Sequence, residues 1–238
     1  MRICFSALAV SFAVLPAVAT TVHGSVALVA SNDPMVRKHK DYSGVVVWLE
    51  PLSGPVDPPP PLRPAQMLQK DKTFKPHVLA IPVGGRVSFP NLDPIFHNAF
   101  SNFNGVIFDV GLYKPGQSRT VAFKRSGIVR VFCNIHPQMS AVIAVMDTPY
   151  FAVSDKTGFF TIENVPPGDY QLHVFHERAS AEILDTLTRK ITVEIAALEL
   201  TPMQISESGY LPVEHKNKYD KDYPPVLEDQ PAYPGAKR

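Results

Sequence analysis

The sequence predicts an all-β protein made of two small sandwiches followed by an extended tail. Short runs of β-branched and aromatic residues, bounded by Gly, Pro and Asp, recur along the chain, and apolar spacing typical of helices is almost absent outside 178–190. A Pro-rich stretch and a polar end containing Tyr and Pro divide the chain further. We expect strands at 43–50, 77–83, 85–90, 119–124, 128–133, 141–146, 158–163 and 169–175.

Residues 1–19 have the form of an export signal. Arg2 is followed by an apolar stretch and by a small-residue A-x-A site at 17–19. This stretch is too short to span a bilayer, and no other apolar run reaches about 18 residues, so no membrane span is expected. We expect a mature chain that begins at Thr20 and works in the periplasm or outside the cell, with an uncleaved N-terminal anchor as the alternative.

The two cysteines, Cys4 and Cys133, have different fates in this interpretation. Cys4 leaves with the signal, so Cys133 is alone in an oxidising compartment, where exported proteins usually pair their thiols. A lone exported cysteine is an exposed thiol, a buried apolar side chain or a metal ligand. Because an exposed thiol is a liability, the choice lies between the last two.

Charge argues against a nucleic-acid partner. The chain has 23 Lys and Arg against 22 Asp and Glu, and no basic stripe runs along it. The basic run RKHK at 37–40 is interpreted as a solvated loop.

A group of soft ligands follows the expected strand 128–133. Cys133, His136 and Met139 have the spacing C-x2-H-x2-M. A blue-copper site needs a thiolate and two imidazoles in a roughly trigonal plane, with a weak axial thioether. The motif supplies all of these except one imidazole, and His97, in the upstream stretch FPNLDPIFHNAFS, supplies the other.

Three other interpretations compete with copper. A buried Cys, a surface His and a core Met could fall at this spacing by chance, with no metal bound. Zinc could also occupy a site with two His and one Cys, although the thioether favours copper. His176-Glu177 begins like a zinc-protease helix, but Ser180 stands where the second His belongs. The histidines outside the motif are expected on or beside strands as surface or satisfied groups (His77, His173, His176) or in ends and loops (His23, His39, His215).

The pair His97-Asn98, followed by Cys133-x2-His136-x2-Met139, resembles the cupredoxins, and its tight spacing looks most like amicyanin. The stretch from Phe74 to Asn91 also looks like the strands that precede the first ligand His of a cupredoxin.

The cupredoxin resemblance covers roughly residues 67–147 and implies a Greek-key copper sandwich. Outer contacts in such a site orient the ligands and tune the metal. The resemblance implies His97, Cys133 and His136 as strong copper ligands, Met139 as the axial ligand, and Asn98 as the residue that ties the two ligand loops together and donates to the Cys sulfur.

The flanks resemble a different family. The pattern D-x-x-G-x-F-x-I-x-x-V-P-P-G-x-Y-x-L-x-V at 155–174 is similar to the latter half of a carboxypeptidase-regulatory-like domain, a small transthyretin-like sandwich, and the first half of that pattern appears at 24–49. The alternative is two independent domains after a loose N-terminal strand pair. The whole arrangement is similar to secreted bacterial proteins labelled methylamine utilisation proteins. We infer one discontinuous sandwich at 20–55 and 148–203, a Pro-rich linker at 56–66, a copper module at 67–147 and an extended tail at 204–238.

These features predict a one-electron carrier and not an enzyme. The sequence has no further His cluster for a second copper site, no second Cys near Cys133, and no G-x-S-x-G or H-E-x-x-H motif. A c-type cytochrome or a dehydrogenase would dock weakly on the apolar rim of His136. Copper storage is a further class, which six scattered Met do not favour. The main alternative is a non-redox carbohydrate- or protein-binding protein with a structural or vestigial copper site, in which Trp48, Tyr150 and Phe151 would stack on sugars.

Overall fold

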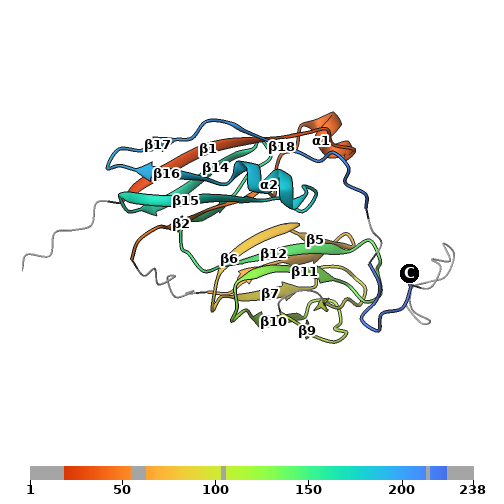
Figure 1. The fold of residues 1–238 in the computed structure, drawn as a ribbon. Helices are drawn as coiled ribbons and strands as arrows, with labels where there is room; N and C mark the ends of the chain where they lie inside the picture. The colour runs from red at the N-terminus through yellow and green to blue at the C-terminus, as the bar shows by residue number, and fades with distance from the viewer. Residues whose placement is uncertain (1–18, 55–62, 103–105, 213–214, 224–238) are drawn as a thin grey trace, which may run out of the picture.

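The computed structural model describes residues 19–54, 63–102, 106–212 and 215–223. Two β-sandwiches lie one on the other (Figure 1). The terminal sandwich is formed by strands within 20–51 and 151–206, and the central sandwich by strands within 65–146. The all-β class predicted from the sequence is therefore confirmed.

The terminal sandwich joins both ends of the chain. In one sheet, β1 pairs antiparallel with β14 and parallel with β17 and β18. The other sheet has the order β13-β2-β15-β16. The bounds are β1 Thr20–Val29, β2 Val46–Pro51, β13 Phe151–Val153, β14 Phe159–Val165, β15 Gly168–Phe175, β16 Arg189–Val193, β17 Leu198–Glu199 and β18 Met203–Ser206.

Alternating side chains build the core of this sandwich. Along β1, every second residue is buried, because successive side chains of a strand point to opposite faces. Val22 and Leu28 pack with Leu49 of the other sheet in one apolar cluster. The turn before β14 requires Gly158, which has a φ of 86°, and a Cβ there would lie 2.0 Å from the Val26 carbonyl oxygen.

The central sandwich carries three groups of strands. A five-stranded sheet has the order β6-β12-β11-β8-β9, a second sheet has the order β10-β7-β3, and β4 and β5 form a hairpin. The bounds are β3 Ala65–Gln66, β4 Leu68–Lys70, β5 Thr73–Lys75, β6 Val78–Pro82, β7 Arg86–Pro90, β8 Phe100–Ser101, β9 Phe108–Asp109, β10 Ser118–Ala122, β11 Gly127–Phe132 and β12 Ser140–Met146.

An apolar layer joins the two sandwiches. Six of the seven residues of β12 are buried, as in a strand that is covered on both faces. One face packs inside the central sandwich, and from the other Val142 and Met146 pack with Val46 of the terminal sandwich. Trp48 and Phe175 lie partly buried against the same layer.

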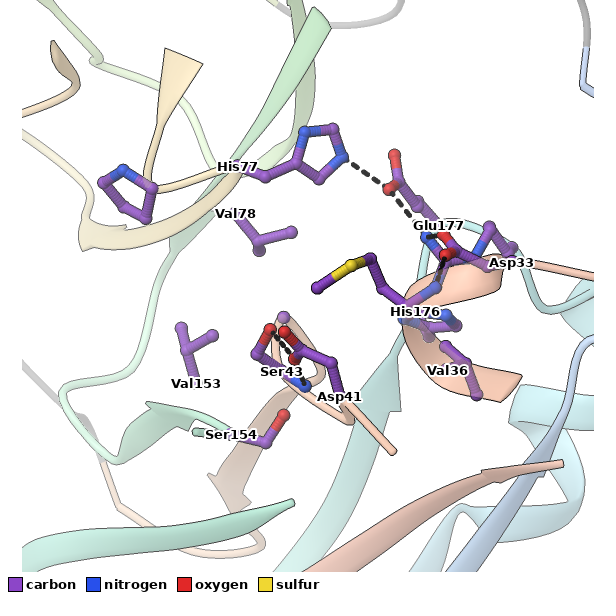
Figure 2. A pocket seen from close by; sticks show the side chains of 14 residues that line it. Asp33, Val36, Asp41, Ser43, His77, Val78, Val153, Ser154, His176 and Glu177 are labelled. Atoms are coloured by element: carbon purple, nitrogen blue, oxygen red, sulfur yellow. Dashed lines mark hydrogen bonds and ion pairs between the residues drawn. The ribbon is translucent and has the colours of Figure 1, made fainter. Parts of the chain in front are cut away.

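A cavity of about 420 Å³ lies beside this layer and has walls from both sandwiches. Figure 2 shows His77, from the central sandwich, in contact with Glu177 at one side of it. The two side chains are 2.5 Å apart at His77 Nε2 and Glu177 Oε1, so a polar contact adds to the apolar layer.

Several elements differ from the sequence predictions. Helix α1, Pro34–His39, forms where 37–40 was expected to be a loop, because Asp33 caps its first turn and Lys40 ends it with a φ of 52°. Helix α2, Ala181–Leu187, lies inside the stretch 178–190 that hinted at a helix. Among the described residues, no helix is both long and apolar enough to cross a membrane.

Two predicted boundaries also need adjustment. Strand β3 lies in the predicted linker 56–66, and β18 extends past residue 203 into the predicted tail. Glu207 is buried, and its carboxylate accepts hydrogen bonds from His176 and Arg178. The predicted signal, apart from residue 19, and linker residues 56–62 lie outside the described part of the chain.

We expect Ile205→Ala to lower the free energy of unfolding by about 2–5 kcal/mol, because Ile205 is fully buried in β18. Leu211→Ala, at a side chain that is 77% exposed, should change it by less than about 0.5 kcal/mol. Urea unfolding followed by the fluorescence of Trp48, the one tryptophan of the sequence, measures both. Equal effects would show that β18 is not part of the core.

Candidate metal centre

The predicted ligands meet at one end of the central sandwich, on two loops. The loop after β7 carries His97 and Asn98, and the loop between β11 and β12 carries Cys133, His136 and Met139. The first loop is fixed beside β9, because the backbones of His97 and Tyr113 exchange two hydrogen bonds of 3.1 and 2.9 Å.

The structure brings His97, Cys133 and His136 together, with one ligand atom from each lying within 4.8 Å of the others. Cys133 Sγ is 3.8 Å from His97 Nδ1 and 3.6 Å from His136 Nδ1. Metal bonds of about 2.3 Å to sulfur and about 2.0 Å to nitrogen, meeting at about 120°, would set those atoms about 3.7 Å apart. The three side chains therefore fit a single trigonally bound metal ion.

Asp93 holds His97 in the orientation that such a site needs. His97 is fully buried, and its Nε2 lies 2.7 Å from Asp93 Oδ2. A carboxylate accepts hydrogen bonds, so Nε2 carries the proton and Nδ1 presents a lone pair toward Cys133. Burial lowers the pKa of His97, which keeps the ring neutral and able to bind a metal.

Asp93 is itself fixed by the hairpin between β4 and β5. Its carboxylate accepts the N–H groups of Asp71 and Lys72 at 2.7 and 2.9 Å. Both turn residues have positive φ, as in the type I′ turn that suits a two-residue hairpin. Although burial raises the pKa of Asp93, these N–H groups and His97 hold it below its ordinary value.

The Cys133 thiol is fully buried between the two loops. Burial raises its pKa, and hydrogen bonds from the backbone N–H groups of Ile135, Asn98 and His136 only partly offset the increase. The metal-free protein therefore holds a protonated thiol at neutral pH. Because a metal binds the thiolate, binding must release this proton.

Asn98 contacts both ligand loops. Its Oδ1 accepts the N–H of Asn134 at 3.3 Å, and its Nδ2 donates to Asp109 Oδ1 at 2.7 Å. Its backbone N–H donates to the Cys133 sulfur, and its carbonyl accepts from the buried side chain of Gln69. The cupredoxin resemblance implied the roles of joining the loops and donating to the sulfur, whereas the contacts with Asp109 and Gln69 were not expected.

Met139 is fully buried at the end of the same loop. Its carbonyl accepts the N–H of Cys133 at 3.2 Å, and its own N–H donates to the carbonyl of His136 at 3.0 Å. The loop thus closes on itself and keeps Met139 in the apolar cluster that contains Cys133. Axial ligation by its sulfur stays a prediction.

His136 is the half-buried member of the cluster. Its ring centroid lies 4.8 Å from that of His97, at 61°. Burial, and then the neighbouring His97, lower the pKa of His136 to about 4, so the ring is neutral at pH 7. Ile135 and Pro137, which flank it in sequence, are also half-buried. Leu112 is 56% exposed and directly precedes Tyr113, whose backbone pairs with that of His97.

Sequence reasoning missed the polar groups behind the ligands. Asp93 could have been found, because it precedes His97 by four residues in an Asp-Pro turn. The buried Gln69 has no such signal, since it reaches Asn98 only through the pairing of distant strands. The Tyr113 hydroxyl lies within hydrogen-bond distance of Gln69 Oε1 and of the Phe89 carbonyl oxygen, which share its one proton as acceptors, and this contact fixes Gln69 in turn.

None of the remaining histidines is part of the three-residue cluster. His77 contacts Glu177 and the Ser140 carbonyl and is satisfied, as expected. His176 is buried with Nε2 2.7 Å from Glu207, but its Nδ1 has no hydrogen-bond partner among the described residues. Contrary to expectation, His23 lies within β1 and His39 ends α1, whereas His215 lies in a loop, as expected, and packs on Phe132. The aromatic residues considered for sugar stacking are also engaged: Trp48 stacks on His173, Tyr150 meets Tyr170 edge-on, and Phe151 packs in the layer between the sandwiches.

Protein-family models and curated protein sequences offer no match to this chain. Among solved structures, it is similar to cupredoxins. The purple cupredoxin from Nitrosopumilus maritimus is 26% identical, and the match covers 34% of this chain and 99% of that one with a TM-score of 0.32.

Two further similar structures are an amicyanin variant with Cu(I) and a nitrite reductase. The amicyanin is 17% identical over 35% of this chain and 82% of its own, with a TM-score of 0.33. The copper-containing nitrite reductase of Thermus scotoductus SA-01 is 23% identical over 51% of this chain and 28% of its own, with a TM-score of 0.34. Because these matches are partial, we interpret the site from its own residues.

We expect Asp93→Ala to weaken metal binding by about 10–100-fold, because His97 loses the partner that sets its tautomer. Competition with a chelator for Cu(II) or Co(II) measures the affinity. Asp147→Ala, at an exposed carboxylate on the same sandwich, is the control. An unchanged affinity in Asp93→Ala would contradict the positioning role of Asp93.

We expect the metal-free protein to lose stability as the pH falls from about 7 to about 4. The pKa of His136 is about 4 in the folded protein, whereas that of an unfolded histidine is about 6.5. Between these values the unfolded chain binds a proton that the folded chain does not, so the free energy of unfolding decreases as the pH falls. His77 acts in the opposite sense, because its pKa is raised: burial lowers it, but Glu177 and the Ser140 carbonyl together more than offset the burial.

Urea unfolding at a series of pH values tests this expectation. His136→Gln should show a smaller loss of stability between pH 7 and 4 than the wild type, and His173→Gln, on the terminal sandwich, should behave like the wild type. Identical pH dependence in the wild type and His136→Gln would rule out the buried, neutral state of His136.

Proposed function

We propose that this chain is an exported mononuclear type 1 copper protein that carries single electrons to or from a periplasmic redox partner. The observation that carries the proposal is the triangle formed by His97 Nδ1, Cys133 Sγ and His136 Nδ1, with sulfur–nitrogen separations of 3.8 and 3.6 Å. Two imidazoles and a thiolate in this arrangement are the equatorial ligands of a blue-copper site.

The choice of copper follows from the donor set. A thiolate and a thioether are soft ligands, and the third residue after His136 is Met139, which is buried in the same cluster as Cys133, rather than a carboxylate. Copper, when bound, supplies a Cu(II)/Cu(I) couple. The protein holds its ligands in place before metal arrives: Asp93 orients His97, and Asn98 joins the loops.

Electron exchange is assigned to the edge of His136. His97 is fully buried, whereas His136 is half-buried and flanked by Ile135 and Pro137. A small apolar rim of this kind suits the weak, brief contacts of electron-transfer partners. A c-type cytochrome or a dehydrogenase is the class of partner that we propose.

A carrier is favoured over an enzyme on sequence grounds, because no His-x-His pair or second Cys accompanies the motif. The non-redox alternative has less support, since Trp48, Tyr150 and Phe151 are occupied by packing contacts.

Addition of Cu(II) to the purified protein tests the proposal. We expect an intense absorption in the red that arises from the thiolate and that Cys133→Ser lacks, while His77→Gln, outside the cluster, retains it. A protein that stays colourless and binds no copper tightly would overturn the carrier function.

A further inference from the structure

We propose that the C-terminal segment 215–223 is a positioning element of the metal centre. It holds the peptide that follows Cys133 and the side chain of Asn98, and through them it raises the reduction potential of the site. This inference rests on the proposed copper function. The segment lies beside the central sandwich, at the end where β11 and β12 are joined (Figure 1).

The first contact fixes the peptide between Cys133 and Asn134. The hydroxyl of Tyr223 donates to the Cys133 carbonyl at 2.7 Å. The N–H of the same peptide unit donates to Asn98 Oδ1 at 3.3 Å. The peptide is therefore held at its carbonyl by the C-terminal segment and at its N–H by the other ligand loop. The next residues, Ile135 and His136, donate their backbone N–H groups to the Cys133 sulfur.

The second contact runs through Lys218. Its backbone N–H donates to Asn134 Oδ1 at 3.0 Å, and its ammonium group lies 2.6 Å from Asp109 Oδ2. The other oxygen of Asp109 accepts from Asn98 Nδ2 at 2.7 Å. A line of charge-assisted hydrogen bonds thus connects the segment to the residue that joins the ligand loops, and such bonds are among the stronger ones in proteins.

The third contact is aromatic. The His215 ring stacks on Phe132, with centroids 4.1 Å apart, and Tyr223 meets His215 edge-on at 5.3 Å. Phe132 is the residue before Cys133, so its side chain points to the opposite face of the sheet from the thiol. The segment therefore seals the outer face of the strand that presents the sulfur, and Phe132 is only 8% exposed.

Internal contacts give the segment a compact shape of its own. The Asn217 carboxamide oxygen accepts the N–H groups of Tyr219 and Lys221 at 2.9 and 3.2 Å. The backbone N–H of Asn217 donates to the carbonyl of Lys221 at 2.9 Å. The turn therefore presents Lys218 and Tyr223 together.

These contacts predict the direction in which the reduction potential shifts when each of them is removed. Without the Tyr223 hydroxyl, the Cys133 carbonyl loses a donor, and the cysteine becomes a better electron donor to the metal. Without the Lys218 ammonium, the Asp109 carboxylate keeps an uncompensated negative charge one hydrogen bond from Asn98. Both changes favour Cu(II), the more positive state, so both lower the reduction potential.

The test compares Tyr223→Phe and Lys218→Met with matched controls in the same full-length protein. Tyr210→Phe removes a hydroxyl from a half-buried tyrosine that lies outside the segment. Lys216→Met removes an ammonium group that contacts Asp220 within the segment. Redox titration of the copper absorption measures the potential, and the rate at which Cys133 reacts with a disulfide reagent in metal-free protein measures how firmly its loop is held.

We expect Tyr223→Phe and Lys218→Met to show a lower potential and a severalfold faster thiol reaction, while both controls match the wild type. Potentials and thiol rates that equal those of the wild type would overturn the inference. If the wild type binds no copper, the proposed function fails, and the metal-free thiol rates decide: faster reaction in the two variants supports the positioning role, and unchanged rates overturn it.

Discussion

Two imidazoles and a thiolate can form one site only if the loops that carry them are held together, and the side chain of Asn98 does this. It accepts the N–H of Asn134 from the Cys133 loop and donates to Asp109. Its backbone N–H reaches the Cys133 sulfur. Asn98 thereby links the loop that carries His97 to the loop that carries Cys133.

The rest of the chain covers the outer face of the sheet that presents the thiolate. Val142 and Ala144 of β12 are buried there against the terminal sandwich, and Phe132 of β11 is buried beneath His215. A sheet covered on both faces carries nearly continuous apolar residues, which is the pattern of β12. The terminal sandwich and the C-terminal segment thus cover different parts of one surface.

The residues that could be predicted are those whose role follows from the spacing of nearby residues in the sequence. Cys133, His136 and Met139 follow one strand, and the alternation of β1 and β15 marks the terminal sandwich. Gln69, Lys218 and Tyr223 could not be predicted, because they reach the site through pairings between segments far apart in sequence. The short elements α1, β3 and β18 were missed or cut short because they depend on a helix cap or on pairing with a distant strand, not on periodicity in the sequence.

A preformed site has consequences for the metal-free protein. The fold buries a thiol and two neutral imidazoles whose ring centroids are only 4.8 Å apart, and it lowers the pKa of His136 to about 4. Burial of polar groups without full hydrogen bonding opposes folding, so the hydrogen bonds of Asp93 and Asn98 and the apolar packing around Met139 must offset it. A metal that binds only the folded chain stabilises that state by mass action. Stability and metal binding are therefore coupled through the same side chains.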